Sequence, residues 1–459
     1  MRIIFDCAPI YTSFRCIDAS AKEIFRVVQV IQEATQARPD GYNFMPKYRA
    51  GLWDGYIRLT KGSSFPTGLL PLVTDKLREA DLPYIQVNNY DTPERDINSI
   101  TPDMFDGMTL RPYQVDAARL LSGHGRGIAN MATNSGKTAV FAAMIKCLSG
   151  GALVLVTGKD LLYQHRESLE CLLREPVGVV GDGHWRPKRV TVGTIQTLSK
   201  HLERIAKFDN LDLVVYDECH HIPSKTSQQV MYGIEAPLRY GFSGTPLSHD
   251  LLSDLILIGA TGPVLTTVTN AQLVDSGISA KPVVRMYTVE SDDSMFDASW
   301  AEAVDSLIVH NQVRNALIAH AVNGAESSST LVLVNRLEHG SLLQELIPGS
   351  VFVNGSSATL ERQDALNKLR DGSGTIVIAT PIFDEGVDVP AVDLLVLAGG
   401  GKSPKKLLQR LGRGMRRKPG DNILHVIDFV DDTNKFLLDH SLEHAKVYEQ
   451  EGFDVEIVE

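Results

Sequence analysis

The chain has 459 residues, of which 43% are hydrophobic and 22% are charged, with a formal net charge of −11. This length predicts two to four domains of about 100–200 residues, and the composition is that of an ordinary globular protein. No run of 18 apolar residues is present and the first residues lack the apolar stretch of a signal peptide, so we expect neither a transmembrane helix nor a leader. Five scattered cysteines without a CxxC pair indicate a reducing, cytoplasmic setting and argue against a zinc site.

The charges are unevenly distributed. Residues 431–459 hold nine acidic residues and two lysines, which we interpret as a solvated helical face. Residues 402–418 hold eight lysines and arginines and no acidic residue. Because local charge matters more than the sum, the negative total does not exclude a nucleic-acid partner.

The first hundred residues carry no phosphate-binding motif and form a region of their own. Residues 20–36 have apolar side chains at helical spacing, which predicts a helix. An Asp-Gly turn at 54–55 precedes strand-like residues. Segment 91–107 is polar and contains prolines, which is typical of a linker.

From residue 110 onward, short apolar runs alternate with helical stretches, which predicts parallel sheets covered by helices. The apolar runs of a first α/β domain are 152–156, 190–194 and 212–216. A hinge is expected near 262–290. The apolar runs of a second α/β domain are 284–289, 330–334, 375–379, 393–397 and 422–428.

Gly136-Lys137-Thr138 follows an apolar segment and opens a helical stretch, which is the context of a phosphate-binding loop. Lys137 would reach the β- and γ-phosphates of a nucleotide, and Thr138 would be a ligand of Mg²⁺. The strict pattern GxxxxGK[ST] fails at its first glycine, where Met131 stands. Asn134 takes another position that is commonly glycine, and asparagine tolerates left-handed backbone geometry. Taken alone, the tripeptide also fits an ordinary loop before a helix.

Asp217-Glu218 directly follow the apolar run 213–216. Ligands bind at the carboxyl ends of strands in α/β sheets. An aspartate there can hold Mg²⁺, and the adjacent glutamate can orient and deprotonate an attacking water. A pair of surface acids is the alternative, but the position about eighty residues after Gly136 favours the functional interpretation.

Arg413 and Arg416 are three residues apart, which predicts that they share one helical face. Their guanidinium groups suit the charge that develops on a γ-phosphate during transfer. A basic surface helix is the alternative. For the preceding lysines, solvation and contact with a nucleic-acid backbone stay equally open; these are Lys402, Lys405 and Lys406.

Taken together, these motifs resemble the paired RecA-like motor of the superfamily 2 helicases of the DExH type. The further segments that match, in the family's order, are 110–114 (LRPYQ), 154–164 (VLVTGKDLLYQ), 193–197 (GTIQT), 243–246 (SGTP), 333–336 (LVNR), 379–381 (ATP), 385–390 (EGVDVP) and 409–416 (QRLGRGMR). The resemblance covers about 70% of the chain. It implies an α/β fold with two RecA-like doubly wound parallel-sheet domains after a small N-terminal α+β domain. The implied limits are 1–105, 106–265 for the ATP-binding domain, and 266–459 for the second domain with its acidic C-terminal helix.

The resemblance also implies the residues of each site, with ATP and Mg²⁺ as cofactors. The catalytic residues would be Lys137, Asp217, Glu218, Arg413 and Arg416. The nucleotide would be bound by Arg111, Gln114, Asn134, Ser135, Gly136, Lys137, Thr138, Gly386 and Asp388. The Mg²⁺ ligands would be Thr138 and Asp217. Nucleic acid would be contacted by Lys159, Thr194, Gln196, Asn335, Arg336 and Thr380.

Residues 43–59 are similar to the leading domain of phage UvsW-type helicases, which remodel branched DNA. Segment 38–61 carries five basic and two acidic residues among aromatic ones, a mixture that suits phosphate contact and base stacking. Lys47, Arg49 and Arg58 are the predicted contacts. Whether the aromatic residues stack on bases or form the core of the small domain stays open.

The predicted function is that of an ATP-dependent DNA helicase or translocase that regresses forks and migrates Holliday junctions. An RNA helicase, or the double-strand translocase subunit of a nuclease or restriction complex, is the alternative. The expected partner is branched DNA, such as forks and four-way junctions. A phage-encoded chain would also meet replication and recombination proteins in the host cytoplasm. We expect a monomer without a membrane partner.

Overall fold

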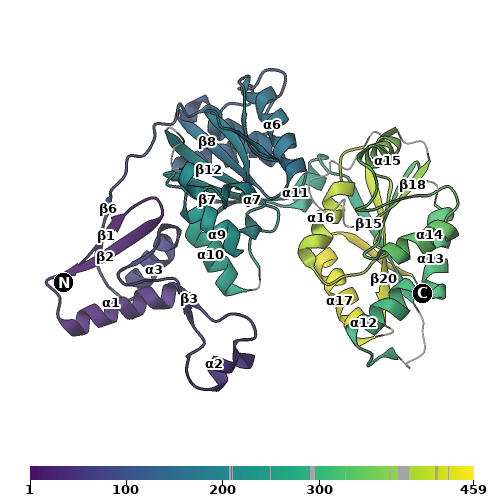
Figure 1. Ribbon diagram of the computed structural model, residues 1–459, viewed down its shortest axis with the longest axis horizontal. Helices are drawn as coiled ribbons and strands as arrows, with labels where there is room; N and C mark the ends of the chain where they lie inside the picture. Colours follow the sequence, from purple (N-terminus) through teal and green to yellow (C-terminus); the bar gives the residue numbers. More distant parts are fainter. Residues whose placement is uncertain are drawn as a thin grey trace. The chain divides into compact units, whose positions relative to one another are not determined.

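In the computed structural model, residues 1–458 are described except for 206–207, 209, 249, 290–294, 326, 372–373, 381–391, 419–421 and 433. The chain folds as two compact units (Figure 1). One holds residues 1–131 and 136–268, and the other holds 132–135 and 269–459. None of the described helices is long and apolar enough to cross a membrane.

The first unit begins with a small α+β region. Its four-stranded sheet has the order β5-β2-β1-β6, in which β1 pairs antiparallel with β2 and parallel with β6. Its strands are β1 (Arg2–Cys7), β2 (Tyr11–Ile17), β5 (Ser64–Pro66) and β6 (Tyr84–Asn88). Its helices are α1 (Ala21–Ala34), the 3₁₀ turn η2 (Thr67–Leu69) and α3 (Leu70–Glu79). The helix predicted at 20–36 is α1, which a capping box of Ser20 and Glu23 starts.

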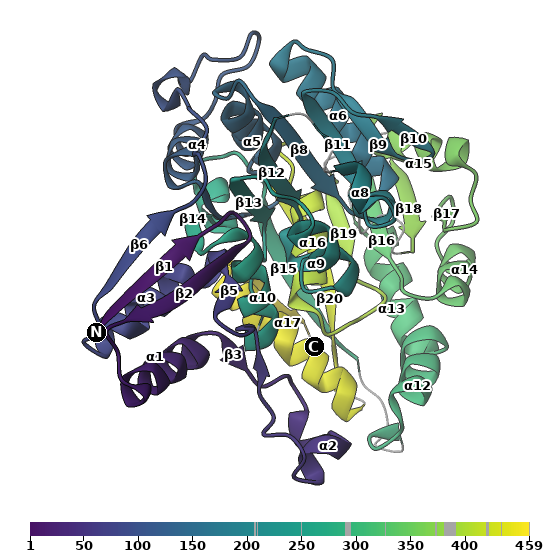
Figure 2. The same cartoon turned by 60° about the vertical axis from the view of Figure 1, so that its left-hand side comes forward.

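An excursion leaves this region between two short paired strands, β3 (Gln36–Ala37) and β4 (Ile57–Arg58). It holds the 3₁₀ turn η1 (Tyr42–Phe44) and the helix α2 (Pro46–Arg49). Figures 1 and 2 show α2 projecting away from the four-stranded sheet. We call residues 38–56 the α2 excursion.

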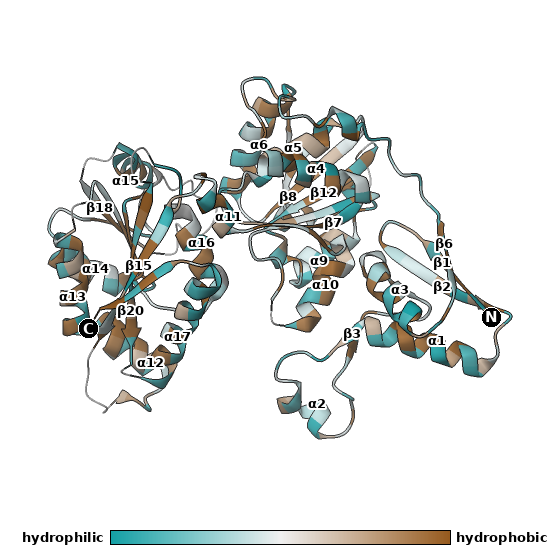
Figure 3. Ribbon diagram, turned by 180° about the vertical axis from the view of Figure 1, so that it is seen from behind, coloured by the Kyte–Doolittle hydropathy of each residue, from teal (hydrophilic) through white to brown (hydrophobic). Residues whose placement is uncertain are grey.

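The small region packs on the helix α10 (Leu251–Thr261) of the same unit. Leu252 and Leu255 of α10 lie in one apolar cluster with Phe65 and Leu69. The contact is close, since a Cβ added to Gly68 would lie 1.9 Å from the carbonyl oxygen of Ile258. Figure 3 shows α10 coloured as hydrophobic along much of its length. The N-terminal region therefore has its own sheet but shares a core with the sheet that follows.

That following sheet has eight strands in the order β10-β9-β11-β8-β12-β13-β7-β14, and only the β9–β10 pair is antiparallel among the described pairings. Its strands are β7 (Arg126–Met131), β8 (Gly151–Val156), β9 (Gly178–Gly181), β10 (His184–Arg186), β11 (Val190–Thr194), β12 (Leu211–Asp217), β13 (Leu238–Ser243) and β14 (Val264–Val268). The helices that join them are α4 (Pro112–His124), α5 (Lys137–Lys146), α6 (Lys159–Leu173), α7 (Ile195–Leu198), α8 (Leu202–Ile205) and α9 (Lys225–Tyr232), with 3₁₀ turns η3 (Ile97–Ser99) and η4 (Cys219–His221). The runs predicted at 152–156, 190–194 and 212–216 are β8, β11 and β12, so the parallel α/β architecture is confirmed.

The second unit has a seven-stranded sheet with the order β17-β18-β16-β19-β20-β15-β21, parallel at each described pairing. Its strands are β15 (Lys281–Val289), β16 (Ser329–Leu333), β17 (Val351–Val353), β18 (Thr375–Ala379), β19 (Leu394–Val396), β20 (Ile423–Asp431) and β21 (Asp454–Val458). Its helices are α11 (Asn270–Asp275), α12 (Trp300–Ala303), the π-helical η6 (Val304–Val309), α13 (Gln312–Asn323), α14 (Leu337–Leu346), α15 (Thr359–Asp371), α16 (Pro404–Gly414) and α17 (Lys435–Gln450). The five apolar runs predicted for a second domain are β15, β16, β18, β19 and β20.

The acidic end of the chain is more ordered than a solvated helix. Helix α17 buries Leu437 and Tyr448, and the chain continues into β21, which pairs with β15. Acidic residues of β21 form ion pairs with the neighbouring strand, Asp454 with Lys281 and Glu456 with Arg285. The acidic tail therefore completes the second sheet.

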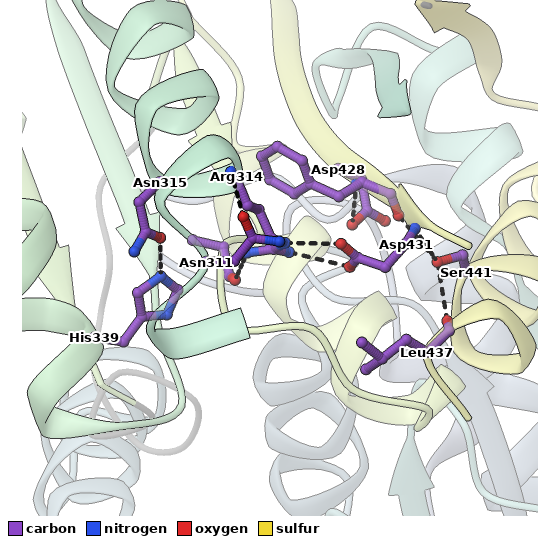
Figure 4. A network of polar contacts seen from close by, with 10 residues as sticks. Asn311, Arg314, Asn315, His339, Asp428, Asp431, Leu437 and Ser441 are labelled. Atoms are coloured by element: carbon purple, nitrogen blue, oxygen red, sulfur yellow. Dashed lines mark hydrogen bonds and ion pairs between the residues drawn. The ribbon is translucent and has the colours of Figure 1, made fainter. Parts of the chain in front are cut away.

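A buried polar network joins β20 to the helices beside it (Figure 4). Arg314 of α13 is fully buried and pairs with Asp431 at the end of β20, at 2.9 Å and 3.3 Å. Close by, burial lowers the pKa of His339 to about 3, and the charge of Arg314 adds to this effect. His339 is therefore neutral at physiological pH, and its Nε2 lies 2.9 Å from the side-chain oxygen of Asn315.

Candidate active site

The predicted phosphate-binding loop connects β7 to α5. Asn134 and Gly136 both have left-handed backbone geometry, with φ of 68° and 79°, so asparagine stands where the loop needs a tolerant residue. Met131 is the last residue of β7 and is fully buried. The departure from the strict glycine pattern therefore falls on a strand residue that packs in the core.

Gln114, the predicted adenine reader, is buried beside this loop. Its Oε1 accepts a hydrogen bond from the backbone N–H of Arg111, at 2.9 Å. A Cβ added to Gly136 would lie 2.3 Å from Gln114 Nε2. Glycine at 136 thus serves two needs, the left-handed turn and the close approach of the glutamine amide.

Lys137 at the start of α5 forms an ion pair with Glu218, which follows β12. Lys137 Nζ lies 3.1 Å from Glu218 Oε1. Burial opposes the charge of both groups, but their mutual attraction outweighs it, so the pKa of Lys137 is raised and that of Glu218 is lowered. Glu218 adopts a left-handed φ of 55°, which a non-glycine residue rarely does. The two residues that the sequence places about eighty positions apart are thus brought together as charged groups.

The SGTP segment is connected to the same glutamate. Ser243 at the end of β13 donates to Glu218 Oε2 over 3.4 Å and lies 2.9 Å from His220 Nδ1. His220 Nδ1 is also 3.3 Å from Glu218 Oε2. The backbone N–H of Thr245 donates to Ser243 Oγ. A change in the position of Glu218 would therefore be felt directly in the 243–246 segment.

The predicted metal ligands Thr138 and Asp217 are joined by His165 of α6. His165 Nε2 lies 2.8 Å from Asp217 Oδ2, and its Nδ1 lies 3.4 Å from Thr138 Oγ1. The other carboxylate oxygen, Asp217 Oδ1, is buried and has no hydrogen-bond partner within the described part of the chain. A hydroxyl and a free carboxylate oxygen are the hard ligands that Mg²⁺ prefers, so the residues present fit this ion.

The residues predicted to touch nucleic acid in the first unit differ in exposure. Lys159 is exposed as the first residue of α6, and the exposed Gln196 donates to the carbonyl of Thr157 at 2.7 Å. The two strand-contact segments therefore lie side by side. Thr194 is buried and bonded to Thr197, so it supports this surface from below.

In the second unit, Asn335 and Arg336 are exposed just after β16. The Asn335 amide donates to the carbonyls of Gly399 and Gly400, and its oxygen accepts from Arg410. Together with Lys402 and Lys406, Asn335 and Arg410 line a cavity of about 330 Å³. The predicted contact Thr380 is buried, at 8% exposure.

The expectation that Arg413 and Arg416 share a helical face is wrong. Helix α16 ends at Gly414, and Arg416 lies beyond it in a backbone bridge with Ser279. The reason is that a strand-like pairing takes over the backbone there before another helical turn can form. The Arg413 side chain, and the predicted nucleotide-facing residues Gly386 and Asp388, lie outside the described residues.

Two family profiles match the chain. The type III restriction enzyme res subunit profile matches residues 107–248, and the helicase conserved C-terminal domain profile matches residues 312–418. Together they cover more than half of the chain and contain the motifs described above. The chain belongs to the superfamily 2 helicases.

Individual relatives of this helicase cover different shares of its length. A protein of Halobacterium salinarum that carries the name DNA 3'-5' helicase Rad25 is 30% identical over 342 residues, which is 72% of this chain and 56% of that protein. The ATP-dependent DNA helicase uvsW of Enterobacteria phage T4 is 24% identical over 90% of this chain and 92% of its own. This helicase thus spans little more than half of the first relative and nearly all of the second.

Solved structures support the fold. A fragment of an HsdR subunit of a type I restriction enzyme from Vibrio vulnificus aligns with a TM-score of 0.59 and 18% identity, over 76% of this helicase and 68% of that chain. At this identity the likeness confirms the two RecA-like domains and says nothing of substrate.

In the N-terminal region of the helicase, most aromatic side chains of the α2 excursion are internal. The guanidinium of Arg38 lies between the rings of Tyr42 and Tyr56, at 4.7 Å and 4.4 Å from their centres. The Trp53 indole N–H donates to the Tyr56 carbonyl. For these residues the structural interpretation left open by the sequence holds, and they form the excursion's own small cluster.

Other side chains of the excursion face outward. Phe44 and Leu52 are 68% and 80% exposed, and Lys47 and Arg49 are exposed between them in the chain. Arg58 instead pairs with Asp54 at 2.5 Å, and this bond lowers the pKa of Asp54 so that the carboxylate stays ionised. The charge of Arg58 is therefore largely neutralised, which leaves Lys47 and Arg49 as the stronger candidates for phosphate contact.

Sequence reasoning missed His165, His220 and Arg38. None of the three stands in a spacing pattern, because each acts through a partner distant in the chain. The one available signal was that His165 follows Gln164, the last residue of a matched motif.

Proposed function

We propose that this helicase is an ATP-driven DNA helicase or translocase that remodels branched DNA by regressing forks and migrating four-way junctions. The observation that carries the proposal is the similarity to the T4 uvsW helicase, which extends over 90% of the chain and so includes the N-terminal region. Motor motifs alone would not favour branched DNA over other nucleic acids.

The hydrolysis site would work through the Lys137–Glu218 pair. Bound Mg²⁺ would supply positive charge beside the phosphates, held by Thr138 and Asp217. A Lys137 ammonium that turns toward a phosphate no longer lowers the pKa of Glu218, and burial then raises it toward the range of a general base. Glu218 would thus become able to accept a proton from water only when Lys137 has engaged a nucleotide.

Nucleotide-dependent movement would reach the nucleic acid through neighbouring contacts. Glu218 touches Ser243 directly, and the 243–246 segment leads to α10, on which the N-terminal region packs. The strand contacts would be made by Lys159 and Gln196 in the first unit and by Asn335 and Arg336 in the second. Hinge motion between two such surfaces is a common way to convert hydrolysis into translocation.

Arg413 is proposed to complete the site from the second RecA-like domain. We expect Arg413→Ala to lower the ATPase rate by roughly 10³-fold or more, because an arginine finger stabilises charge that appears only in the transition state. Binding of a fluorescent ATP analogue should change little. A variant that lost nucleotide binding but hydrolysed at the normal maximal rate would contradict this role, and Arg417→Ala, exposed nearby, is the control.

The α2 excursion is proposed to contact DNA at the branch. Deleting the whole N-terminal region would expose Leu252 and Leu255 of α10, so a smaller change is the better test. Ala37 and Ile57 are direct partners in the β3–β4 pair. Replacing residues 38–56 by Asn-Gly would therefore close β3 and β4 as a two-residue hairpin and leave the core intact.

We expect this excision to spare basal ATPase activity and to weaken binding to four-way junctions more than binding to linear duplex. The double change Lys47→Ala and Arg49→Ala should reduce the dependence of affinity on salt by up to two phosphate contacts. Lys22→Ala, an exposed lysine on α1, is the matched control. Junction binding and unwinding that survive the excision unchanged would remove the excursion from the proposal.

Two alternatives remain with specific tests. The res subunit profile over residues 107–248 favours a double-strand translocase subunit, which would hydrolyse ATP on linear duplex and separate no strands. An RNA helicase would be stimulated by structured RNA rather than by junctions. ATPase and unwinding assays on forks, four-way junctions, linear duplex and RNA hairpins distinguish all three. We further propose a monomer that acts in the cytoplasm, with replication and recombination proteins as partners if it is phage-encoded.

A further inference from the structure

We propose that His165 is a positioning residue of the hydrolysis site, which holds both predicted magnesium ligands and connects them to the helix that begins at the strand contact. The inference rests on the proposed ATP site and adds to it a residue outside the matched motifs. Three observations carry it: two contacts of one imidazole, an orphaned carboxylate oxygen, and the place of the helix.

The imidazole is fixed on every side. His165 is 4% exposed, and its ring packs edge-on against Phe141 of α5, with ring centres 5.4 Å apart. Phe141 packs in turn on Phe242 of β13. The ring therefore has little freedom to leave Asp217 and Thr138.

The chemistry of the two contacts determines what each nitrogen does. The Asp217 carboxylate only accepts, so Nε2 of His165, 2.8 Å away, carries a hydrogen and donates it. Nδ1 of this tautomer has a lone pair and can accept the hydroxyl hydrogen of Thr138. One neutral histidine thus uses both nitrogens, and each predicted ligand has a defined orientation.

This arrangement leaves free the atoms that a cation needs. With its hydrogen directed at His165, the Thr138 hydroxyl presents lone pairs. With Oδ2 bound to His165, Asp217 keeps Oδ1, which is buried and without a hydrogen-bond partner among the described residues. Outer partners that orient metal ligands in this way typically contribute 10- to 100-fold in metal affinity.

The helix α6 connects this position to the proposed DNA surface. It starts at the exposed Lys159 and reaches His165 after less than two turns. Thr157, just before it, accepts the hydrogen bond from Gln196. A strand bound at Lys159 and Gln196 would therefore bias the position of His165, and through it that of both ligands.

Substitutions can separate the two contacts. His165→Phe keeps the packing on Phe141 and removes both hydrogen bonds. His165→Gln places an amide near the Nε2 position and can still donate to Asp217, whereas His165→Asn places one near the Nδ1 position and can serve only Thr138. We expect metal affinity to fall in the order wild type, Gln, Phe, with the Gln variant partly rescued.

The measurement is binding of Mn²⁺ to the complex of the full chain with ADP, followed by electron paramagnetic resonance, beside binding of a fluorescent ADP with EDTA present. We expect His165→Phe to weaken Mn²⁺ binding 10- to 100-fold and to leave metal-free ADP affinity within about twofold. Unchanged Mn²⁺ affinity, or an equal loss in both measurements, would show that His165 is only a packing residue. Asp217→Asn separates the levels: if it too leaves Mn²⁺ affinity unchanged, the proposed ATP site itself is wrong.

Discussion

Glu218→Gln is expected to lower the ATPase rate by about 10²–10⁴-fold while the protein still binds ATP, because the amide cannot take a proton from water. The substitution keeps the shape of the side chain, and its oxygen can still accept from Lys137, which lies 3.1 Å from Glu218 Oε1. The contacts of Ser243 and His220 with the other carboxylate oxygen would lose charge but not space. The effect should therefore lie in turnover rather than in folding.

The measurement combines steady-state ATPase rates with binding of a fluorescent ATP analogue and circular dichroism. Lys137→Ala is the informative comparison, since it should lose binding as well as turnover by removing the phosphate contact. If the Glu218→Gln protein hydrolysed ATP within tenfold of the unchanged protein, the general base would have to be another group. Loss of binding in this variant alone would instead assign Glu218 to holding Lys137 in place.

The hydrolysis site was largely predictable from sequence because phosphate chemistry fixes residue types at short spacings. Lys137, Thr138, Asp217 and Glu218 each stand directly at the carboxyl end of an apolar run or at the start of the following helix. In a parallel sheet such positions meet at one edge. The pairing of Lys137 with Glu218 follows from the fold with no further information.

The parts that sequence did not predict lack such a pattern. Strand β13 contains Arg239, so it does not read as an apolar run, yet this arginine is buried because it donates to the carbonyls of Met231, Ile234 and Ala260. Strand β21 is acidic and was taken as part of a solvated end, but its acids pair with β15. His165 stands alone in a helix, and only the folded chain places it between two metal ligands.

The buried pair of Arg314 and Asp431 carries the largest expected effect on stability. Asp431→Asn leaves the guanidinium of Arg314 fully buried without its carboxylate, and breaking such a pair typically costs about 3–5 kcal/mol. Arg314 would keep its bond to the Ala398 carbonyl and its position over the Phe429 ring, so the cost falls mainly on the unpaired charge. The whole of β20 ends in this network (Figure 4).

Since the chain has two units, a single unfolding free energy is not well defined, and hydrogen exchange measured on peptides is the suitable readout. Amides of β20 and α13 should exchange roughly a hundred- to a few-thousand-fold faster in Asp431→Asn, which is the stated cost at about 1.4 kcal/mol per tenfold. Amides of β8 in the first unit should not change. The double variant Arg314→Met with Asp431→Leu should recover most of the protection, because apolar side chains of similar volume often replace a buried ion pair without loss. Recovery would mean that the pair specifies an arrangement more than it stabilises the sheet. If the double variant were instead as unprotected as the single one, the bond of Arg314 to the Ala398 carbonyl would be the interaction that holds β19 in place.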